Sequence, residues 1–316
     1  MEKEEKEKNK EIGRIRREKK REKRLIEEKR KKILVGITYF HNTSQFDKKD
    51  PYFINSVKTM GLTKSKVRFT NSHYTKRLLV LDEVISEYEK YDHNVNIMIT
   101  TNSEEGVRYI KDNFKDRLFS IELPKICLKT NYHLPWATIN NMERYKDKYD
   151  VYIYSEDDTL IPKNAFNAWL EDTNILWERK LYRIFLRIDE WNESEIYNKI
   201  NIYNRKYGQQ PVAHCACWSM TSDQFDFYLK GEMSHLTEDL ENKYCKEKSD
   251  VFMDIRVLAS SGLVADPRLV DFKRITFKRH NHNGYIRLME NGVVSEESKV
   301  FHLGCKQFKK KKKNKM

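Results

Sequence analysis

Three consecutive acids, Glu156-Asp157-Asp158, are the residues of this chain best suited to chemistry. They directly follow residues 151–154, a short β-branched and aromatic run that predicts a buried strand. Adjacent carboxylates repel one another unless a cation offsets their charge, and Mg²⁺ and Mn²⁺ prefer oxygen ligands. The triplet therefore predicts a divalent-cation site that bridges diphosphate oxygens and stabilises a leaving group. The alternative is a solvated acidic loop or the start of a helix over residues 163–170.

The first half of the chain alternates between strand and helix patterns. Strand signals cover residues 33–38, 95–101, 118–121 and 151–154, and helical spacing covers residues 78–88, 104–114 and 136–149. This alternation predicts an α/β fold with a parallel sheet covered on both faces, in which ligands bind at the carboxyl ends of strands. The second half predicts strands near 182–188 and 212–220, helices near 223–228 and 251–260, and irregular polar sequence from Pro267.

The formal net charge of +13 is concentrated at the two ends of the chain. Residues 1–32 carry sixteen Lys and Arg against nine Glu, and residues 306–316 carry seven Lys and no acid. The sequence therefore predicts a charged helical or disordered arm (1–32), one continuous domain (33–305) and a Lys-rich tail (306–316). The tails are either solvated or contacts for RNA or anionic lipid.

Neither end of the chain looks like a membrane anchor. No apolar run approaches the ~18 residues that span a bilayer, and the first residues lack a secretory apolar region. The five cysteines show no paired spacing, so reduced thiols and a cytoplasmic location are expected. In residues 214–217, His-Cys-Ala-Cys, strand alternation explains the spacing better than a zinc site does.

A family resemblance rests on residues 154–162, Tyr-Ser-Glu-Asp-Asp-Thr-Leu-Ile-Pro, continuing to Phe166 and Trp169. This segment resembles the Glu-Asp-Asp variant of the Asp-X-Asp motif in GT-A glycosyltransferases, especially N-acetylglucosaminyltransferase I-like enzymes and related eukaryotic and viral proteins. Looser matches follow the expected order at residues 134–137, 185–187 and 217–221. The resemblance implies a GT-A (Rossmann-like) α/β fold with a mixed, mainly parallel sheet flanked by helices.

The same resemblance implies roles for individual residues. Asp158 would bind Mn²⁺ or Mg²⁺ directly, Glu156 would face the donor ribose or metal waters, and Asp157 would support the metal shell. Thr38 and Tyr39, with His41 nearby, are the candidates to contact a UDP- or GDP-linked sugar donor after the first strand. The acceptor would be a hydroxyl of a glycan or glycoprotein, whose oxygen attacks the anomeric carbon of the donor sugar with inversion.

Enzymes of this family often complete the metal shell from near the C-terminus. His280 and then His282 are the candidates, since an extended segment points both the same way, and His302 is a third. The alternative for the pair is a polar surface loop. Asp254 lies in a region resembling the one that supplies the catalytic base, and a salt bridge is its alternative role.

The sequence thus predicts a metal-dependent glycosyltransferase that uses a nucleotide sugar. A metal-dependent nuclease or nucleotidyltransferase is the first alternative, with Glu238 and Asp239 as its second acidic cluster. A tail-driven RNA- or membrane-binding protein with an inactive domain is the other.

Overall fold

The computed structural model describes much of the predicted domain. The described residues are 30–41, 72–124, 133–188, 201–203, 207–209, 217–237, 240, 259, 262–266, 268–269, 284–290 and 294–303. None of the helices within these ranges combines the length and the apolar character that a membrane crossing requires. Nearly all of the predicted arm and the whole predicted tail lie outside the described residues, so the division into 1–32, 33–305 and 306–316 stays a prediction.

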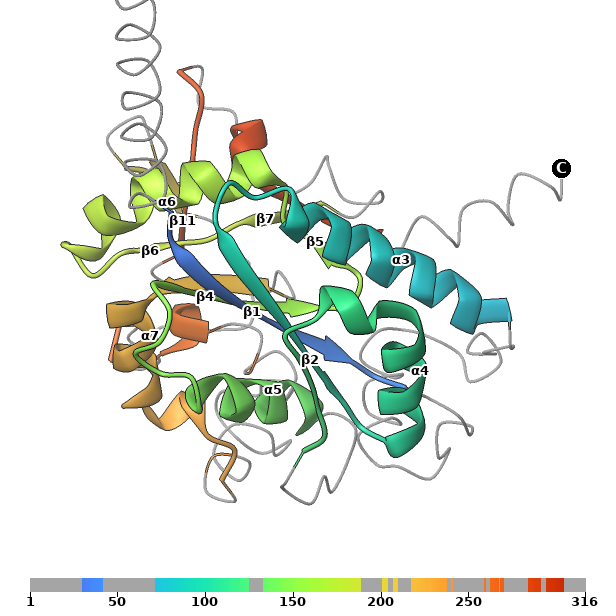
Figure 1. The fold of residues 1–316 in the computed structure, drawn as a ribbon. Helices are drawn as coiled ribbons and strands as arrows, with labels where there is room; N and C mark the ends of the chain where they lie inside the picture. Colours follow the sequence, from blue (N-terminus) through green and yellow to red (C-terminus); the bar gives the residue numbers. More distant parts are fainter. Residues whose placement is uncertain are drawn as a thin grey trace, which may run out of the picture.

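A five-stranded sheet lies at the centre of the fold, in the order β10-β4-β1-β2-β3 (Figure 1). Its strands are β1 (Lys32–Tyr39), β2 (Asn94–Thr101), β3 (Ser120–Glu122), β4 (Val151–Glu156) and β10 (Cys217–Thr221). β1 is parallel to β2 and β4, β2 is parallel to β3, and β10 runs antiparallel to β4. The predicted α/β fold with a mixed, mainly parallel sheet is confirmed.

Helices cover both faces of this sheet. α3 (Ser72–Glu89), α4 (Glu104–Phe114) and α6 (Lys163–Trp177) pack on one face, and α5 (Leu134–Glu143) and α7 (Ser222–Leu229) pack on the other. Figure 1 shows α3 and α6 above the strands and α5 and α7 below them. Along β1, Val35 and Ile37 belong to the apolar cluster with α3 and α6, whereas Leu34 belongs to the cluster with α5 and α7. Each such buried side chain contributes about 1.5–3 kcal/mol.

Gly36 allows α5 to approach β1 closely. A Cβ atom at Gly36 would lie 2.4 Å from the sulfur of Met142 and 3.1 Å from a methyl group of Thr138. The hydroxyl oxygens of Thr138 and Thr38 lie 2.7 Å apart. The first half of α5 is therefore held against the end of β1.

The helix expected over residues 136–149 begins earlier and ends sooner than predicted. Pro135 lies in the first turn of α5, where its missing N–H costs no hydrogen bond. After Glu143 the chain turns, and Asp147 adopts a left-handed φ of 65° that ends helical geometry. Apolar spacing alone did not reveal either boundary.

Two small sheets flank the central one. The first has the order β6-β11-β9-β8, and the second has the order β5-β12-β7. Their strands are β5 (Thr159–Leu160), β6 (Tyr182–Arg183), β7 (Leu186–Ile188), β8 (Asn201–Tyr203), β9 (Tyr207–Gln209), β11 (Gly284–Arg287) and β12 (Lys299–His302).

These sheets correct two sequence predictions. Residues 182–188 form two strands in different sheets instead of one, and the chain after Pro267 contributes β11 and β12 instead of being irregular throughout. Strands of two to four residues are too short to show a clear period of two, so their pairing comes from tertiary context.

Candidate functional site

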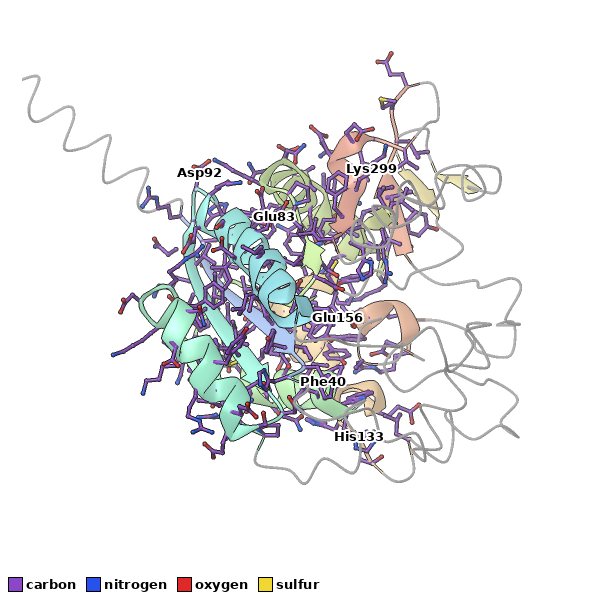
Figure 2. All side chains as sticks on the ribbon, turned by 90° about the vertical axis from the view of Figure 1, so that its right-hand side faces the viewer. Phe40, Glu83, Asp92, His133, Glu156 and Lys299 are labelled. Atoms are coloured by element: carbon purple, nitrogen blue, oxygen red, sulfur yellow. The ribbon has the colours of Figure 1, made fainter. Side chains whose placement is uncertain are left out.

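The acidic triplet lies where the strand order of the central sheet reverses. From β1 the chain proceeds outward to β2 and β3, and then returns to form β4 on the opposite side of β1. Open α/β sheets bind ligands at the carboxyl ends of the strands that flank such a switch point. Glu156 ends β4, and it lies opposite Thr38 of β1 in the parallel register. In Figure 2, Glu156 lies near the middle of the molecule, between Phe40 and Lys299.

A tight turn presents the other two acids. Asp157 and Asp158 connect β4 to β5, and the backbone N–H of Asp157 donates to the carbonyl of Thr38 at 3.2 Å. The hydroxyl of Ser155 donates to the carbonyl of Thr159 at 3.0 Å across the same turn. These bonds fix the backbone of the turn to the ends of β1 and β5.

The C-terminal strand β12 closes the site. It pairs antiparallel with β5, which places His302 opposite Thr159, and parallel with β7. The N–H of Leu303 donates to the carbonyl of Asp158 at 2.7 Å, and Nε2 of His302 lies 3.0 Å from Oδ2 of Asp158. Arg187 on β7 places Nη2 3.1 Å from Nδ1 of His302. Arg187, His302 and Asp158 therefore form one continuous chain of polar contacts.

Glu156 is the acid whose ionisation the site changes most clearly. Burial is the largest cause that raises its pKa to about 7, and the negative charge of Asp158 contributes to the rise, whereas the cation of Arg187 opposes it. Asp157 adds to the rise and His302 opposes it. A group with these neighbours ionises more readily when a cation enters the site.

The stability of the metal-free protein is expected to fall between pH 5 and pH 8 through Glu156. The unfolded carboxyl ionises near 4.5 and the folded one near 7, so the folded state holds the extra proton in this range and loses its advantage as the pH rises. The loss is about 2–3 kcal/mol in the free energy of unfolding. Urea unfolding at both pH values measures it in the wild type and in Glu156→Gln, which lacks the titrating group.

An exposed acid on α3 provides the control for this prediction. Glu83→Gln should keep the pH dependence of the wild type, since Glu83 is exposed. Parallel pH profiles for wild type and Glu156→Gln would contradict the prediction.

The two residues expected to contact the donor from β1 occupy different faces of the sheet. Thr38 is buried beside α5, and its hydroxyl lies 3.5 Å from that of Tyr154 as well as 2.7 Å from that of Thr138. Tyr39 is fully buried in the apolar cluster with α3 and α6. The side chain of Tyr39 thus presents no surface to a donor, whereas Thr38 lies beside the acidic triplet.

A buried ionic cluster fixes the start of β12. Oδ2 of Asp172 lies 2.8 Å from Nε of Arg287 and 3.4 Å from Nε of Arg183, and Oδ1 of Asp172 lies 2.9 Å from Nη2 of Arg287. Both arginines bond Ser298 at 2.9 Å, Arg183 through Nη2 and Arg287 through its backbone N–H. Ser298 ends the short helix η8 (Glu296–Ser298) and directly precedes β12. The cluster therefore ties α6, β6 and β11 to the strand that carries His302.

No protein-family model matches this chain. No curated protein matches it either.

Comparison with solved structures finds distant similarities. A crystal structure of S. aureus TarS has a TM-score of 0.36 at 8% identity, over 74% of this chain and 33% of that one. S. aureus TarS 1–349 in complex with UDP has a TM-score of 0.32 at 11% identity, over 72% and 54%. CMP:2-keto-3-deoxy-manno-octonic acid synthetase complexed with CTP has a TM-score of 0.36 at 12% identity, over 67% and 83%. This chain thus spans about a third of the first of these structures, and similarities of this size add no argument about its activity.

The remaining sequence candidates lie outside the described residues. This applies to Asp254, His280, His282 and the pair Glu238-Asp239, so their proposed roles stay predictions. Of residues 214–217, Cys217 alone is described, and it is a buried residue at the start of β10. His302, the third of the histidine candidates, lies within the described residues, and its Nε2 contacts Asp158 of the triplet.

Arg187 was not among the sequence candidates for the site. It belongs to residues 185–187, a segment whose resemblance to the family carried no assigned role. Its place in the site comes from the pairing of β7 with β12, two short strands far apart in the sequence.

The donor set fits a cation that also binds its substrate. No group of three or more His, Cys, Asp or Glu side chains in the described ranges is arranged to hold a metal ion. Mg²⁺ commonly keeps several waters and takes one or two carboxylates together with substrate phosphates. Asp158, whose side chain is 28% exposed, and the adjoining Glu156 provide oxygen ligands of that kind.

Proposed function

We propose that this protein is a metal-dependent glycosyltransferase that moves a sugar from a UDP- or GDP-linked donor to a hydroxyl of a glycan or glycoprotein, with inversion. The observation that carries the proposal is the acidic turn at the switch point between β1 and β4, closed by β12. Carboxylates at this place in an α/β sheet suit a ligand that is itself bound through a cation.

Each acid of the turn has a proposed part in holding the donor. Asp158 binds Mn²⁺ or Mg²⁺ through its carboxylate, Glu156 faces the donor ribose or the waters of the ion, and Asp157 supports this arrangement. When bound, the ion neutralises negative charge that develops on the departing nucleoside diphosphate. Thr38, which pairs with Glu156 in the parallel register, is proposed to contact the donor.

Other proposed roles depend on residues outside the described ranges. Asp254 is proposed to take the proton from the acceptor hydroxyl as that oxygen attacks the anomeric carbon. His280 and His282 are proposed to approach the diphosphate or the ion.

Thermal unfolding with nucleotides tests the proposal. Mn²⁺ together with UDP or GDP at about 100 times the dissociation constant should stabilise the folded state by about 2.7 kcal/mol, which raises Tm by roughly 5–10 °C. Either component alone should shift Tm much less, because the acids of the turn would hold the ion and the ion would supply the positive charge that binds the diphosphate. Donor hydrolysis or transfer with Mn²⁺ present and chelated completes the assay.

The alternatives give different results in the same assay. A nuclease would be stabilised by an oligonucleotide in preference to a nucleotide sugar, and a nucleotidyltransferase by a nucleoside triphosphate. Deleting residues 1–32 and 306–316 should preserve donor affinity in a glycosyltransferase. If the protein without these two segments bound none of the tested ligands, the result would contradict the proposal and favour a tail-driven binder.

A further inference from the structure

The order of contacts from Arg187 to Asp158 determines which nitrogen of His302 carries a proton. Nη2 of Arg187 lies 3.1 Å from Nδ1 of His302, and Nε2 of His302 lies 3.0 Å from Oδ2 of Asp158. All three side chains are sheltered from bulk water to some degree, with His302 15% exposed. One ring nitrogen thus faces a cation and the other faces a carboxylate.

Donor and acceptor chemistry leaves one arrangement of protons. A guanidinium is always protonated and has only N–H donors, so Nδ1 of His302 must accept from Arg187 and carry no hydrogen. The proton of the neutral ring then lies on Nε2, from which it is donated to the carboxylate of Asp158. A nitrogen that carries hydrogen has no lone pair with which to bind a metal ion.

This placement of the ring proton is the reverse of the one that metal-binding histidines usually show. Such a histidine binds the metal with one nitrogen and donates its other N–H to a carboxylate, a carbonyl or water. Here the outer nitrogen of His302 accepts from Arg187 instead of donating. The parallel pairing of β7 with β12 holds the arginine in that place.

We propose that Arg187 is a positioning residue that fixes His302 in the Nε2–H tautomer, so that the imidazole orients Asp158 and does not bind the cation. A carboxylate has about four lone-pair sites, and one hydrogen bond uses one of them, so Asp158 still serves as an oxygen ligand. The part played toward the ion rests on the proposed function, whereas the tautomer does not.

Nitrogen NMR of the full-length, metal-free protein tests the tautomer directly. Histidine labelled with ¹⁵N gives separate signals for protonated and unprotonated ring nitrogens, and His302→Gln assigns the signal of His302 by its loss. At pH 8 we expect Nε2 protonated and Nδ1 unprotonated. A protonated Nδ1 in the wild type would overturn the proposal, and this result needs no variant of Arg187 to fold and no ligand to bind.

Pulsed electron paramagnetic resonance with Mn²⁺ and UDP tests the role toward the ion, because it detects nitrogen bound directly to manganese. We expect the spectra of wild type and His302→Gln to show the same coupling between manganese and nitrogen, since His302 is not a ligand of the ion. In Arg187→Met the proton is able to move to Nδ1, which leaves a lone pair on Nε2 for the ion. We therefore expect a nitrogen coupling in Arg187→Met that disappears in the double variant Arg187→Met/His302→Gln. Arg144→Met, which removes an exposed arginine paired with Glu122, should match the wild type.

The outcomes separate this proposal from the proposed function. A coupling in the wild type that is lost in His302→Gln would overturn the positioning role, because His302 would then be a ligand. Absence of any bound Mn²⁺ in the wild type would contradict the proposed function, while the NMR result would still decide the tautomer.

Discussion

Replacing Asp158 with asparagine is expected to lower kcat/KM for sugar transfer about a thousandfold. Asparagine keeps the shape of the side chain and an oxygen that accepts from His302, so the turn between β4 and β5 should persist. The variant loses the negative charge that holds the cation, and a bound ion contributes several kcal/mol of charge stabilisation in the transition state. Steady-state kinetics with Mn²⁺, together with titration of Mn²⁺ in the presence of UDP, measure the loss.

A second aspartate provides the matched control for Asp158. Asp147 is exposed and precedes β4, at the opposite edge of the sheet. Its left-handed backbone tolerates asparagine, so Asp147→Asn should leave both the kinetics and the Mn²⁺ affinity unchanged. Retention of more than about a tenth of the activity in Asp158→Asn would remove the role assigned to this carboxylate.

Replacing Asp172 with asparagine is expected to reduce the free energy of unfolding by about 3–5 kcal/mol. Asp172 is fully buried and is shared by Arg183, also fully buried, and Arg287. Removing its charge leaves the buried guanidinium of Arg183 without the carboxylate that offsets it, whereas Arg287 keeps only the more exposed carboxylates of Glu171 and Glu297. Urea unfolding measures the change, and the corresponding fall in Tm is roughly 10 °C.

The neighbouring acid Glu171 provides the matched control for Asp172. It bonds the same Arg287 at 2.8 Å, but its side chain is 69% exposed. Glu171→Gln should therefore cost less than about 1 kcal/mol, as exposed ion pairs usually do. Equal losses of unfolding free energy in Asp172→Asn and Glu171→Gln would show that the burial of Asp172 does not cause the destabilisation. Because the cluster anchors β12, Asp172→Asn should also weaken Mn²⁺ binding in the part of the population that stays folded.

The central sheet was predictable because its strands are long or strongly apolar. β1 is buried at every position after its first and β4 at every position before its last, as expected of short, continuous apolar runs covered on both faces. α4 begins and ends at the predicted residues, since Ser103 caps it through the N–H of Gly106. Local sequence thus carried enough information to place the triplet at a strand end.

The rest of the site was less accessible to sequence reasoning. His302 and Arg187 lie on strands of four and three residues, whose partners are set by packing far away in the chain. The sequence favours His280 and His282 over His302 because two residues of one type at alternating positions form a clearer pattern. The burial that raises the pKa of Glu156 also depends on tertiary structure, and no local sequence pattern predicts it.

The late position of β12 affects how the molecule is made. The contact between Arg187 and His302 joins residues 115 positions apart, and a ribosome needs roughly 6–23 s to synthesise that length. During this interval the emerging polypeptide contains the three crowded carboxylates but lacks the histidine that will hold one of them. The nascent chain should therefore be unable to form the complete site until the translation of β12.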